Sequence, residues 1–210
     1  MSTFDFDSVA RRYYTGHELA RVKKMHIGLA GAGGLGSNCA VFLARAGFRH
    51  FTIVDHDTVE ISNLNRQVYT HIHVGRPKVD CLAEVLRAIN PGATIEAVRA
   101  RLDRSTVGPL LGSCDAVVEA LDTPDGKAMV VEELAPTGTM LVCASGIAGA
   151  GNSDVITTNR VRPNLYIVGD RVSDTEKGER PLAPRVALAA AKQADVILAR
   201  ALGEADVPGE

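Results

Sequence analysis

A glycine-rich loop between a strand and a helix constrains the fold of this chain more than any other feature of its sequence. The apolar run 26–30 leads into residues 31–36, Gly-Ala-Gly-Gly-Leu-Gly, and a helical stretch follows over 37–46. A second apolar run, 51–54, ends at Asp55, which lies 19 residues after the last glycine of the loop. Glycines let backbone amides approach a phosphate, and the start of the helix supplies partial positive charge. The order of these segments therefore predicts a mononucleotide-binding β-α-β unit.

Apolar segments and helical segments alternate along the rest of the chain, which predicts a mostly parallel sheet covered on both faces. We expect further strands at 94–99, 116–119 and 140–144, and helices at 77–89, 105–111 and 126–135. Two paired strands (153–161 and 164–168), an exposed mobile loop (169–181) and an alanine-rich helix (184–202) are expected to follow. The prediction is one α/β domain over residues 1–210, with a doubly wound sheet and a Rossmann-like nucleotide-binding unit.

Charge and composition argue against several classes of function. The sequence has 23 Lys and Arg against 25 Asp and Glu, a formal net charge of −2, without a long block of one sign. That balance disfavours an electrostatic binder of nucleic acid or membrane surfaces, and 4% aromatic residues without Trp disfavour base stacking. The sequence has no apolar run of roughly 18 residues and no basic-then-apolar leader, so we expect a cytoplasmic protein without nucleic-acid or membrane partners.

The four cysteines are widely spaced and form no CxxC pair, so neither a zinc ribbon nor a thioredoxin-like motif is available. Each cysteine has apolar or small neighbours, as in Val-Cys-Ala at 142–144. We interpret them as small buried hydrophobes in a reducing compartment.

The segment after Asp55 separates two classes of nucleotide-binding enzyme. It carries Arg66 and, further on, Lys78, just beyond the acid that can accept both ribose hydroxyls. A dehydrogenase has no need for two cations there, whereas an enzyme that acts on a triphosphate needs them to neutralise the charge of the leaving pyrophosphate. No Walker A motif is present, so the chain is not a P-loop enzyme.

Several motifs together resemble the ThiF/MoeB/ubiquitin-activating superfamily. They are the glycine loop, the segment Asp55-x-Asp57-Thr-Val…Ser-Asn63-Leu-x-Arg66-Gln67, Gly75-x-Pro77-Lys78, Asn90-Pro91 and Ala120-Leu121-Asp122. The resemblance extends over residues 10 to 202, and in size and C-terminal form the chain is most similar to compact ThiF proteins.

The resemblance implies an adenylyltransferase that activates the C-terminal glycine of a small ubiquitin-like sulfur carrier, with ThiS of thiamine synthesis as the nearest case. The carrier carboxylate would attack the α-phosphorus of ATP and form an acyl adenylate and pyrophosphate. No general base is needed, because the carboxylate is already an anion, so catalysis would depend on positioning and charge neutralisation. We expect a homodimer, with a sulfur donor as a further partner.

The resemblance also implies roles for individual residues. Asp55 would bind ribose, and Asn63, Arg66 and Lys78 the phosphates, while Asp122 would hold Mg²⁺, which prefers one or two carboxylates together with phosphate oxygens. Arg66, Lys78 and Asp122 are the predicted catalytic residues. The predicted nucleotide site comprises Gly31, Gly33, Gly34, Gly36, Asp55, Asp57, Asn63, Arg66, Gln67 and Lys78.

The chain departs from this family at four places. The two zinc-binding CxxC pairs of larger relatives are absent, so no zinc is expected, and the crossover loop (169–182) has no cysteine to take a thioester. The N-terminal arm (1–24) has Thr15 where the Arg-Tyr-x-Arg pattern has its second arginine; Arg11 or Arg12 would have to replace it at a partner's active site. The usual Thr-Asp-Asn of the metal site is Leu-Asp-Thr at 121–123.

Other interpretations of the chain and its residues stay open at this stage. The acceptor could be a molybdopterin carrier or the carboxylate of a modified tRNA base; an NAD-dependent oxidoreductase and a non-catalytic ThiF-like scaffold are more distant alternatives. Asp122 could cap a helix, Arg66 could be a surface arginine and Lys78 a solvated first-turn residue. Asp57 could orient Arg66 or a backbone amide. His71-x-His73 lacks a third metal ligand and is better explained as a loop or edge-strand pair.

Overall fold

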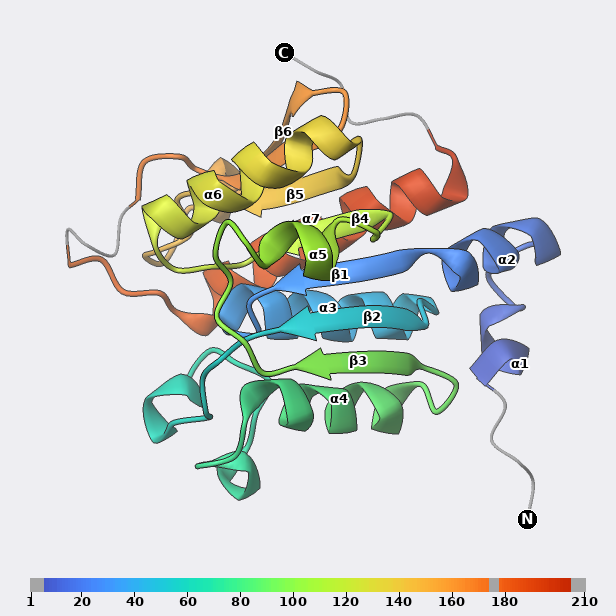
Figure 1. The fold of residues 1–210 in the computed structure, drawn as a ribbon, viewed down its shortest axis with the longest axis horizontal. Coiled ribbons are helices and arrows are strands. Elements are labelled where there is room, and N and C mark those ends of the chain that lie inside the picture. Colours follow the sequence, from blue (N-terminus) through green and yellow to red (C-terminus); the bar gives the residue numbers. More distant parts are fainter. Residues whose placement is uncertain (1–5, 174–177, 205–210) are drawn as a thin grey trace.

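The computed structural model describes residues 6–173 and 178–204, which fold around a central sheet (Figure 1). The seven strands of the sheet have the spatial order β3-β2-β1-β4-β5-β7-β6. All neighbouring strands are parallel except β6, which runs antiparallel to β7. The strands are β1 (His26–Ala30), β2 (His50–Val54), β3 (Thr94–Val98), β4 (Ala116–Glu119), β5 (Met140–Ala144), β6 (Thr157–Arg162) and β7 (Leu165–Gly169).

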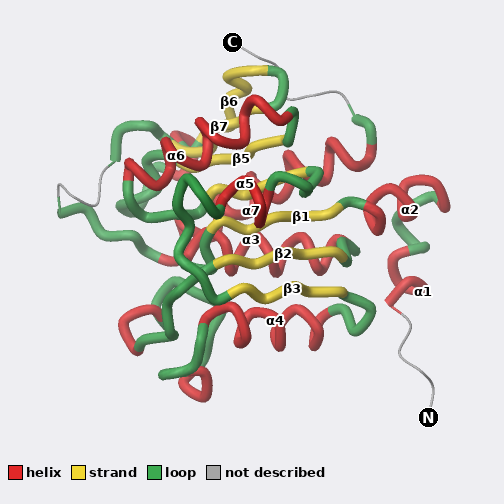
Figure 2. Tube along the Cα trace, viewed as in Figure 1, coloured by secondary structure: helices red, strands yellow, loops and turns green. Residues whose placement is uncertain are grey.

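Helices cover both faces of this sheet (Figure 2). The described helices are α1 (Phe6–Ala10), α2 (Gly16–Lys24), α3 (Gly34–Ala46), α4 (Lys78–Ile89), α5 (Val107–Leu111), α6 (Pro124–Leu134) and α7 (Ala183–Leu202). Apolar residues of α3, α4 and α7 form one hydrophobic core with the sheet, and those of α5 and α6 form a second core on the opposite face. Four 3₁₀ turns complete the described elements: η1 (Ile61–Asn63), η2 (His71–His73), η3 (Ala135–Thr137) and η4 (Ser153–Val155).

The observed architecture confirms the predicted doubly wound α/β fold, with small differences at the ends of elements. The helix expected at 77 begins one residue later, because Pro77 is its N-cap. The strand expected over 153–161 begins at Thr157, because η4 occupies the start of that range. Residues 1–5 of the predicted arm and 174–177 of the predicted mobile loop lie outside the described residues.

The strand order creates a switch point between β1 and β4. The chain leaves β1 toward β2 and β3 on one side, whereas β4, β5 and β7 continue the sheet on the other. In doubly wound sheets the ligand crevice lies at the carboxyl ends of the two strands that flank such a point. Ala120, which follows β4, donates its N–H to the carbonyl of Ala30 at 2.9 Å, so the turn after β4 lies beside the glycine loop after β1.

The N-terminal arm lies at the other end of the strands (Figure 1). Helix α2 begins with a capping box, in which Thr15 and Glu18 satisfy each other's backbone N–H groups, and it ends at Lys24, just before β1 starts. Among the described helices, none is both long and apolar enough to cross a bilayer.

Candidate functional site

The glycine loop has a backbone shape that other residues would not tolerate. Gly31 has φ of 104°, and a Cβ atom there would lie 2.8 Å from the carbonyl oxygen of Ala120. A Cβ atom at Gly36 would collide with the carbonyl oxygen of Gly31. Gly33 is the N-cap of α3, without a side-chain cap, so the first backbone amides of this 13-residue helix are available to an anion.

Asp55 holds this loop in place from the end of β2. Its Oδ2 accepts the N–H of Ala32 at 2.7 Å, and its Oδ1 accepts the N–H of Asp57 at 2.8 Å. A carboxylate has about four lone-pair sites, so Asp55 retains acceptor capacity for the two hydroxyls of a ribose. The side chain therefore shapes the loop and remains suited to the predicted ribose contact.

Asp57 and Lys78 form an ion pair at the edge of the site. Lys78 Nζ lies 2.7 Å from Asp57 Oδ2, and only 8% of the Lys78 side chain is exposed. Burial acts to raise the pKa of Asp57, but the hydrogen bond and charge of Lys78, helped by His56 and Arg101, outweigh it and hold that pKa below its usual value. Lys78 is therefore not a solvated first-turn residue, and the partner of Asp57 is Lys78 rather than Arg66.

Arg66 lies against the glycine loop from a neighbouring turn. Its Cγ would be 3.6 Å from a Cβ at Gly34, and its carbonyl accepts a hydrogen bond from Asn38 of α3 at 2.9 Å. Its guanidinium donates to the carbonyl of Ser62 at 3.0 Å and to Asn65 Oδ1 at 2.8 Å. Among the described residues no carboxylate pairs with Arg66, so this half-buried cation is available to an anion beside the loop.

Asn63 and Gln67 flank Arg66 in the same turn. Asn63 is buried, and its Oδ1 accepts the N–H of Glu60 at 3.1 Å, so its side chain stabilises η1. Gln67 Nε2 would lie 3.9 Å from a Cβ at Gly33, and Gln67 Oε1 is buried without a hydrogen-bond partner among the described residues. Gln67 therefore offers a hydrogen-bond acceptor beside the glycine loop, whereas the side chain of Asn63 stabilises the backbone of η1.

The sequence analysis did not identify Tyr69, which connects the glycine loop to the start of α4. Its hydroxyl lies 2.8 Å from the carbonyl of Ala32 and 3.3 Å from that of Lys78, and the residue is 3% exposed. Burial, with Asp55 and Cys81 adding to it, raises the pKa of Tyr69, so the hydroxyl stays protonated and can donate. An aromatic residue two positions after Gln67 is the only signal that the sequence offered.

Asp122 lies in the turn between β4 and α6, beside the glycine loop at the switch point. It is exposed, and among the described residues it has no hydrogen-bond or ion-pair partner. It does not cap α6, because Thr123 is the N-cap and accepts the N–H of Gly126 at 3.2 Å. A carboxylate without a described partner next to the glycine loop fits the oxygen-donor preference of Mg²⁺, and Asp125, also exposed, lies in the first turn of α6.

The remaining singled-out residues lie away from the glycine loop. His73 is buried, and its Nδ1 accepts the N–H of Thr70 at 3.0 Å; it packs edge-on against Tyr69, which favours the structural interpretation of this pair. Arg11 and Arg12 follow α1 in the sequence, and α1 lies near the amino ends of the strands, at the end opposite the glycine loop (Figure 1). One chain does not bring either arginine to its own glycine loop, and their contribution to a partner's site stays a prediction.

All four cysteines are free and buried. Burial raises the pKa of Cys114 and of Cys143 to about 12, and it also raises the pKa of Cys39 and Cys81. None of these thiols is therefore an activated nucleophile.

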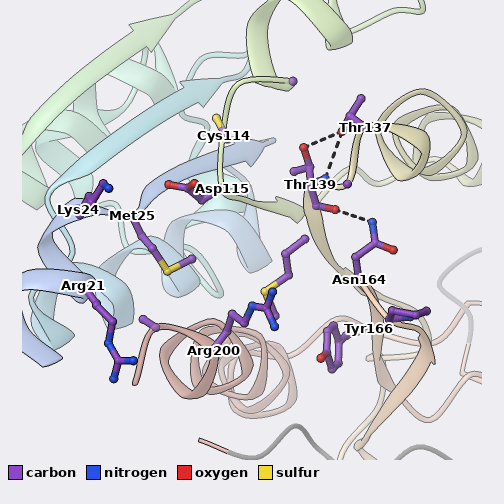
Figure 3. A pocket seen from close by; sticks show the side chains of 15 residues that line it. Arg21, Lys24, Met25, Cys114, Asp115, Thr137, Thr139, Asn164, Tyr166 and Arg200 are labelled. Carbon is purple, nitrogen blue, oxygen red and sulfur yellow. Dashed lines mark hydrogen bonds between the residues drawn. The ribbon is translucent and has the colours of Figure 1, made fainter. Parts of the chain in front are cut away.

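A shallow cavity of about 590 Å³ lies at the amino ends of the strands, far from the glycine loop (Figure 3). Arg21, Lys24 and Arg200 line it, and they belong to the last turns of α2 and α7. Cations at helix C-termini complement the partial negative charge there, and Arg21 hydrogen-bonds the carbonyl of Leu202. The helix ends account for the cations in this cavity, which is separate from the glycine loop.

Comparison with known sequences identifies relatives of this chain. It matches the ThiF family over residues 9–206. It is 35% identical over 152 residues to the adenylyltransferase and sulfurtransferase uba4 of Aspergillus clavatus, which covers 72% of this chain and 30% of that protein. It is 40% identical over 103 residues to the SAMP-activating enzyme E1 of Haloferax volcanii, which covers 49% of this chain and 38% of that protein. The matches span about a third of the length of these curated relatives.

Comparison with solved structures identifies the same fold. The chain is similar to the Escherichia coli tRNA N6-threonylcarbamoyladenosine dehydratase TcdA in complex with ATP, with a TM-score of 0.84, 21% identity and coverage of 93% of both chains. A second structure of that enzyme, with AMP, has a TM-score of 0.82. At this identity the likeness establishes the fold alone.

Proposed function

The chain belongs to the ThiF family, and from that premise we propose that it adenylylates the C-terminal carboxylate of a small ubiquitin-like sulfur carrier of the ThiS type, with release of pyrophosphate. The observation that carries the proposal is that the unpaired cation Arg66 lies against a glycine loop that opens a helix. The preorganised cation Lys78 is connected to the same loop through Asp57 and Asp55. A bare nucleotide-binding loop needs neither cation, whereas attack at a triphosphate needs both.

The residues would divide the work between holding ATP and stabilising its transition state. The loop and the start of α3 would hold the phosphates, and Asp55 would hold the ribose. Lys78 and Arg66 would neutralise the charge that grows on the leaving pyrophosphate as the carrier carboxylate attacks the α-phosphorus. The bond to the β-phosphate oxygen breaks as the acyl–phosphate bond forms, and no proton has to move.

Mg²⁺ is the cofactor that we propose for Asp122. Bound there, the ion would supply charge neutralisation between the phosphate oxygens. The chain's own contribution is an exposed carboxylate in a turn that the sheet and α6 hold beside the glycine loop.

The acceptor and the assembly are the finer parts of the proposal. The relatives named above include an enzyme that activates SAMP, which supports a ubiquitin-like acceptor. Thiamine synthesis, a sulfur donor and a homodimer are proposed on the resemblance to compact ThiF proteins, and a cytoplasmic location on the sequence pattern described above. A second candidate keeps the adenylation but uses the carboxylate of a modified tRNA base, since the fold covers 93% of a tRNA-modifying enzyme.

The test is ATP–pyrophosphate exchange, measured with a panel of purified carriers and with modified tRNA. Exchange that depends on a ThiS-type carrier with an intact C-terminal glycine supports the proposal. Exchange that depends on tRNA instead supports the second candidate. Absence of exchange with every acceptor, from an enzyme that binds ATP, contradicts both.

A further inference from the structure

An ion pair between a buried carboxylate and a partly exposed lysine lies next to the turn that carries Asp122. Glu119, the last residue of β4, is fully buried, and its carboxylate lies 3.1 and 3.2 Å from Nζ of Lys127 in α6. Burial raises the pKa of Glu119, and the charge of Lys127 opposes that effect. Burying a carboxylate costs free energy of folding even when the group is paired with a cation. The contacts of Glu119 therefore indicate which part of the structure this side chain holds.

The same carboxylate also holds the main chain of the turn. Glu119 Oε1 accepts the N–H of Leu121, the residue before Asp122, at 2.7 Å. From the other face of the sheet, Gln193 of α7 donates to the backbone carbonyl of Glu119 at 3.4 Å and to that of Val142 at 2.9 Å. The start of the turn is therefore fixed from both faces, and its end is fixed by the cap of α6, which leaves Asp122 exposed between two anchored points.

We propose that Glu119, held by Lys127, is a positioning residue that fixes the backbone of Leu121 and thereby aims the Asp122 carboxylate at the metal of the proposed nucleotide complex. The inference rests on the proposed function, which assigns the metal to Asp122. Glu119 cannot touch the nucleotide, because none of its surface is exposed. It acts through one hydrogen bond, in which its Oε1 accepts the main-chain N–H of Leu121.

A purely structural role makes a different prediction. If the pair only joined β4 to α6, its loss would lower stability and leave metal affinity unchanged in the folded enzyme. If it aims Asp122, its loss reduces metal affinity even where the sheet is intact, as expected for groups that orient metal ligands.

The experiment compares the variants Glu119→Ala, Glu119→Gln and Lys127→Met with a control variant, Glu132→Ala. Glu132 is an exposed acid on α6, the helix that carries Lys127, and it pairs with Arg104. Two readouts are independent of turnover: hydrogen exchange of the Leu121 amide in the free enzyme, and Mn²⁺ affinity with a non-hydrolysable ATP analogue, followed by electron paramagnetic resonance. We expect Glu119→Ala to accelerate exchange of that amide and to weaken Mn²⁺ binding by about 10- to 100-fold. Glu119→Gln, whose amide oxygen can still accept the Leu121 N–H, should retain most of the affinity, and Glu132→Ala all of it.

The outcomes separate this inference from the proposed function. A folded Glu119→Ala enzyme with unchanged Mn²⁺ affinity overturns the positioning role. If that variant does not fold, Lys127→Met decides: we expect it to release the Glu119 carboxylate, accelerate exchange of the Leu121 amide and weaken Mn²⁺ binding. Faster exchange of that amide with wild-type affinity overturns the positioning role, and wild-type exchange with wild-type affinity shows that Lys127 does not hold Glu119 for it. If Asp122→Asn binds Mn²⁺ like the wild type, the metal assignment fails and the inference fails with it. If no acceptor supports exchange while Asp122→Asn and Glu119→Ala both lose Mn²⁺, the positioning role holds and only the proposed reaction is wrong.

Discussion

The two sides of the glycine loop present their charges in opposite ways. On the β2 side, Lys78 is buried and paired with Asp57, and Asp55 is bonded to two backbone amides. On the other side, Asp122 is exposed at the switch point, and Arg66 lies in the turn next to Gly34. Among the described residues, Asp122 has no partner and Arg66 has no carboxylate partner. The β2 side is held by the protein itself, whereas the charges of Asp122 and Arg66 are not balanced by an opposite charge among the described residues.

This difference indicates which groups are set before ATP arrives. A cation that is already held at a fixed position costs no reorganisation when charge develops in the transition state. A free carboxylate next to a phosphate loop instead repels the nucleotide until a divalent cation lies between them. The comparison predicts that substitution of Asp122 or Arg66 lowers the reaction rate alone. Substitution of the paired Lys78 should lower both the rate and the stability of the folded chain.

The largest expected effect is that of Asp122→Asn. This variant should lose ATP–pyrophosphate exchange almost completely while ATP affinity stays within about tenfold, because the metal stabilises charge that grows toward the transition state. The melting temperature should not fall, since Asp122 has no partner among the described residues. Exchange rates and equilibrium binding of ATP measure the two parts. Near-normal turnover in this variant means that the carboxylate is not a metal ligand.

The second prediction compares one cation from each side. Lys78→Ala and Arg66→Ala should each raise the barrier by about 2.7–4 kcal/mol, as for loss of one preorganised donor. Their stabilities should differ, because Lys78→Ala leaves Asp57 without its cation and removes a buried stem, whereas Arg66→Ala leaves no acid unpaired. Exchange kinetics and thermal unfolding of both variants test this together. Effects below threefold on exchange would identify the two as structural cations, and equal melting temperatures would remove the distinction between the two sides.

The fold was predictable because its signals are local. Apolar runs of four or five residues, glycine at 47 and the break at 90–92 each mark an element boundary in the sequence, and the structure places the elements within a few residues of those marks. The order of the strands in the sheet has no such local signal in the sequence. It depends on which faces pack together, and the alternation of elements predicts a parallel sheet without giving its order.

The sequence did not reveal how the predicted site residues pair with one another. Asp57 and Lys78 are 21 residues apart, and they meet because Thr58 and Pro77 form an isolated antiparallel bridge that returns the chain to β2. Nothing in the spacing of 57 and 78 reveals that bridge, so Asp57 was open to other partners. Tyr69 was missed for the same reason, since its role depends on a hydroxyl that reaches two carbonyls far apart in sequence.

A smaller effect is expected from Asp57→Asn, and it depends on pH. The pKa of Asp57 is lowered in the folded chain, so its contribution to stability is present above the unfolded pKa of about 3.9 and is lost as pH falls through the folded value. Half of this side chain is exposed, so the contribution at neutral pH is at most about 1 kcal/mol. Unfolding by denaturant from pH 7 to pH 3 should show the gap between wild type and variant narrowing below about pH 4. A gap that is constant with pH would show that Lys78 does not depend on this charge.

The smallest expected effect is none at all, and it concerns the thiols. Transfer of an activated carrier to the enzyme needs a thiolate on a reachable segment near the adenylate. Here all four cysteines are buried with a raised pKa, and the described part of the crossover loop offers Ser173, whose hydroxyl accepts the N–H of Ala148 at 3.0 Å. Thr175, the other hydroxyl of that loop, lies outside the described residues. Because none of these thiols, nor Ser173 in the described part of the loop, is activated for attack on the acyl adenylate, we expect the adenylate to be released or handed directly to a sulfur donor. Enzyme, ATP and carrier run on a non-reducing denaturing gel should give no band at the summed mass. A thiol-sensitive band that disappears in one Cys→Ala variant would contradict this prediction. It would show that a cysteine that is buried in the structure becomes exposed during the reaction.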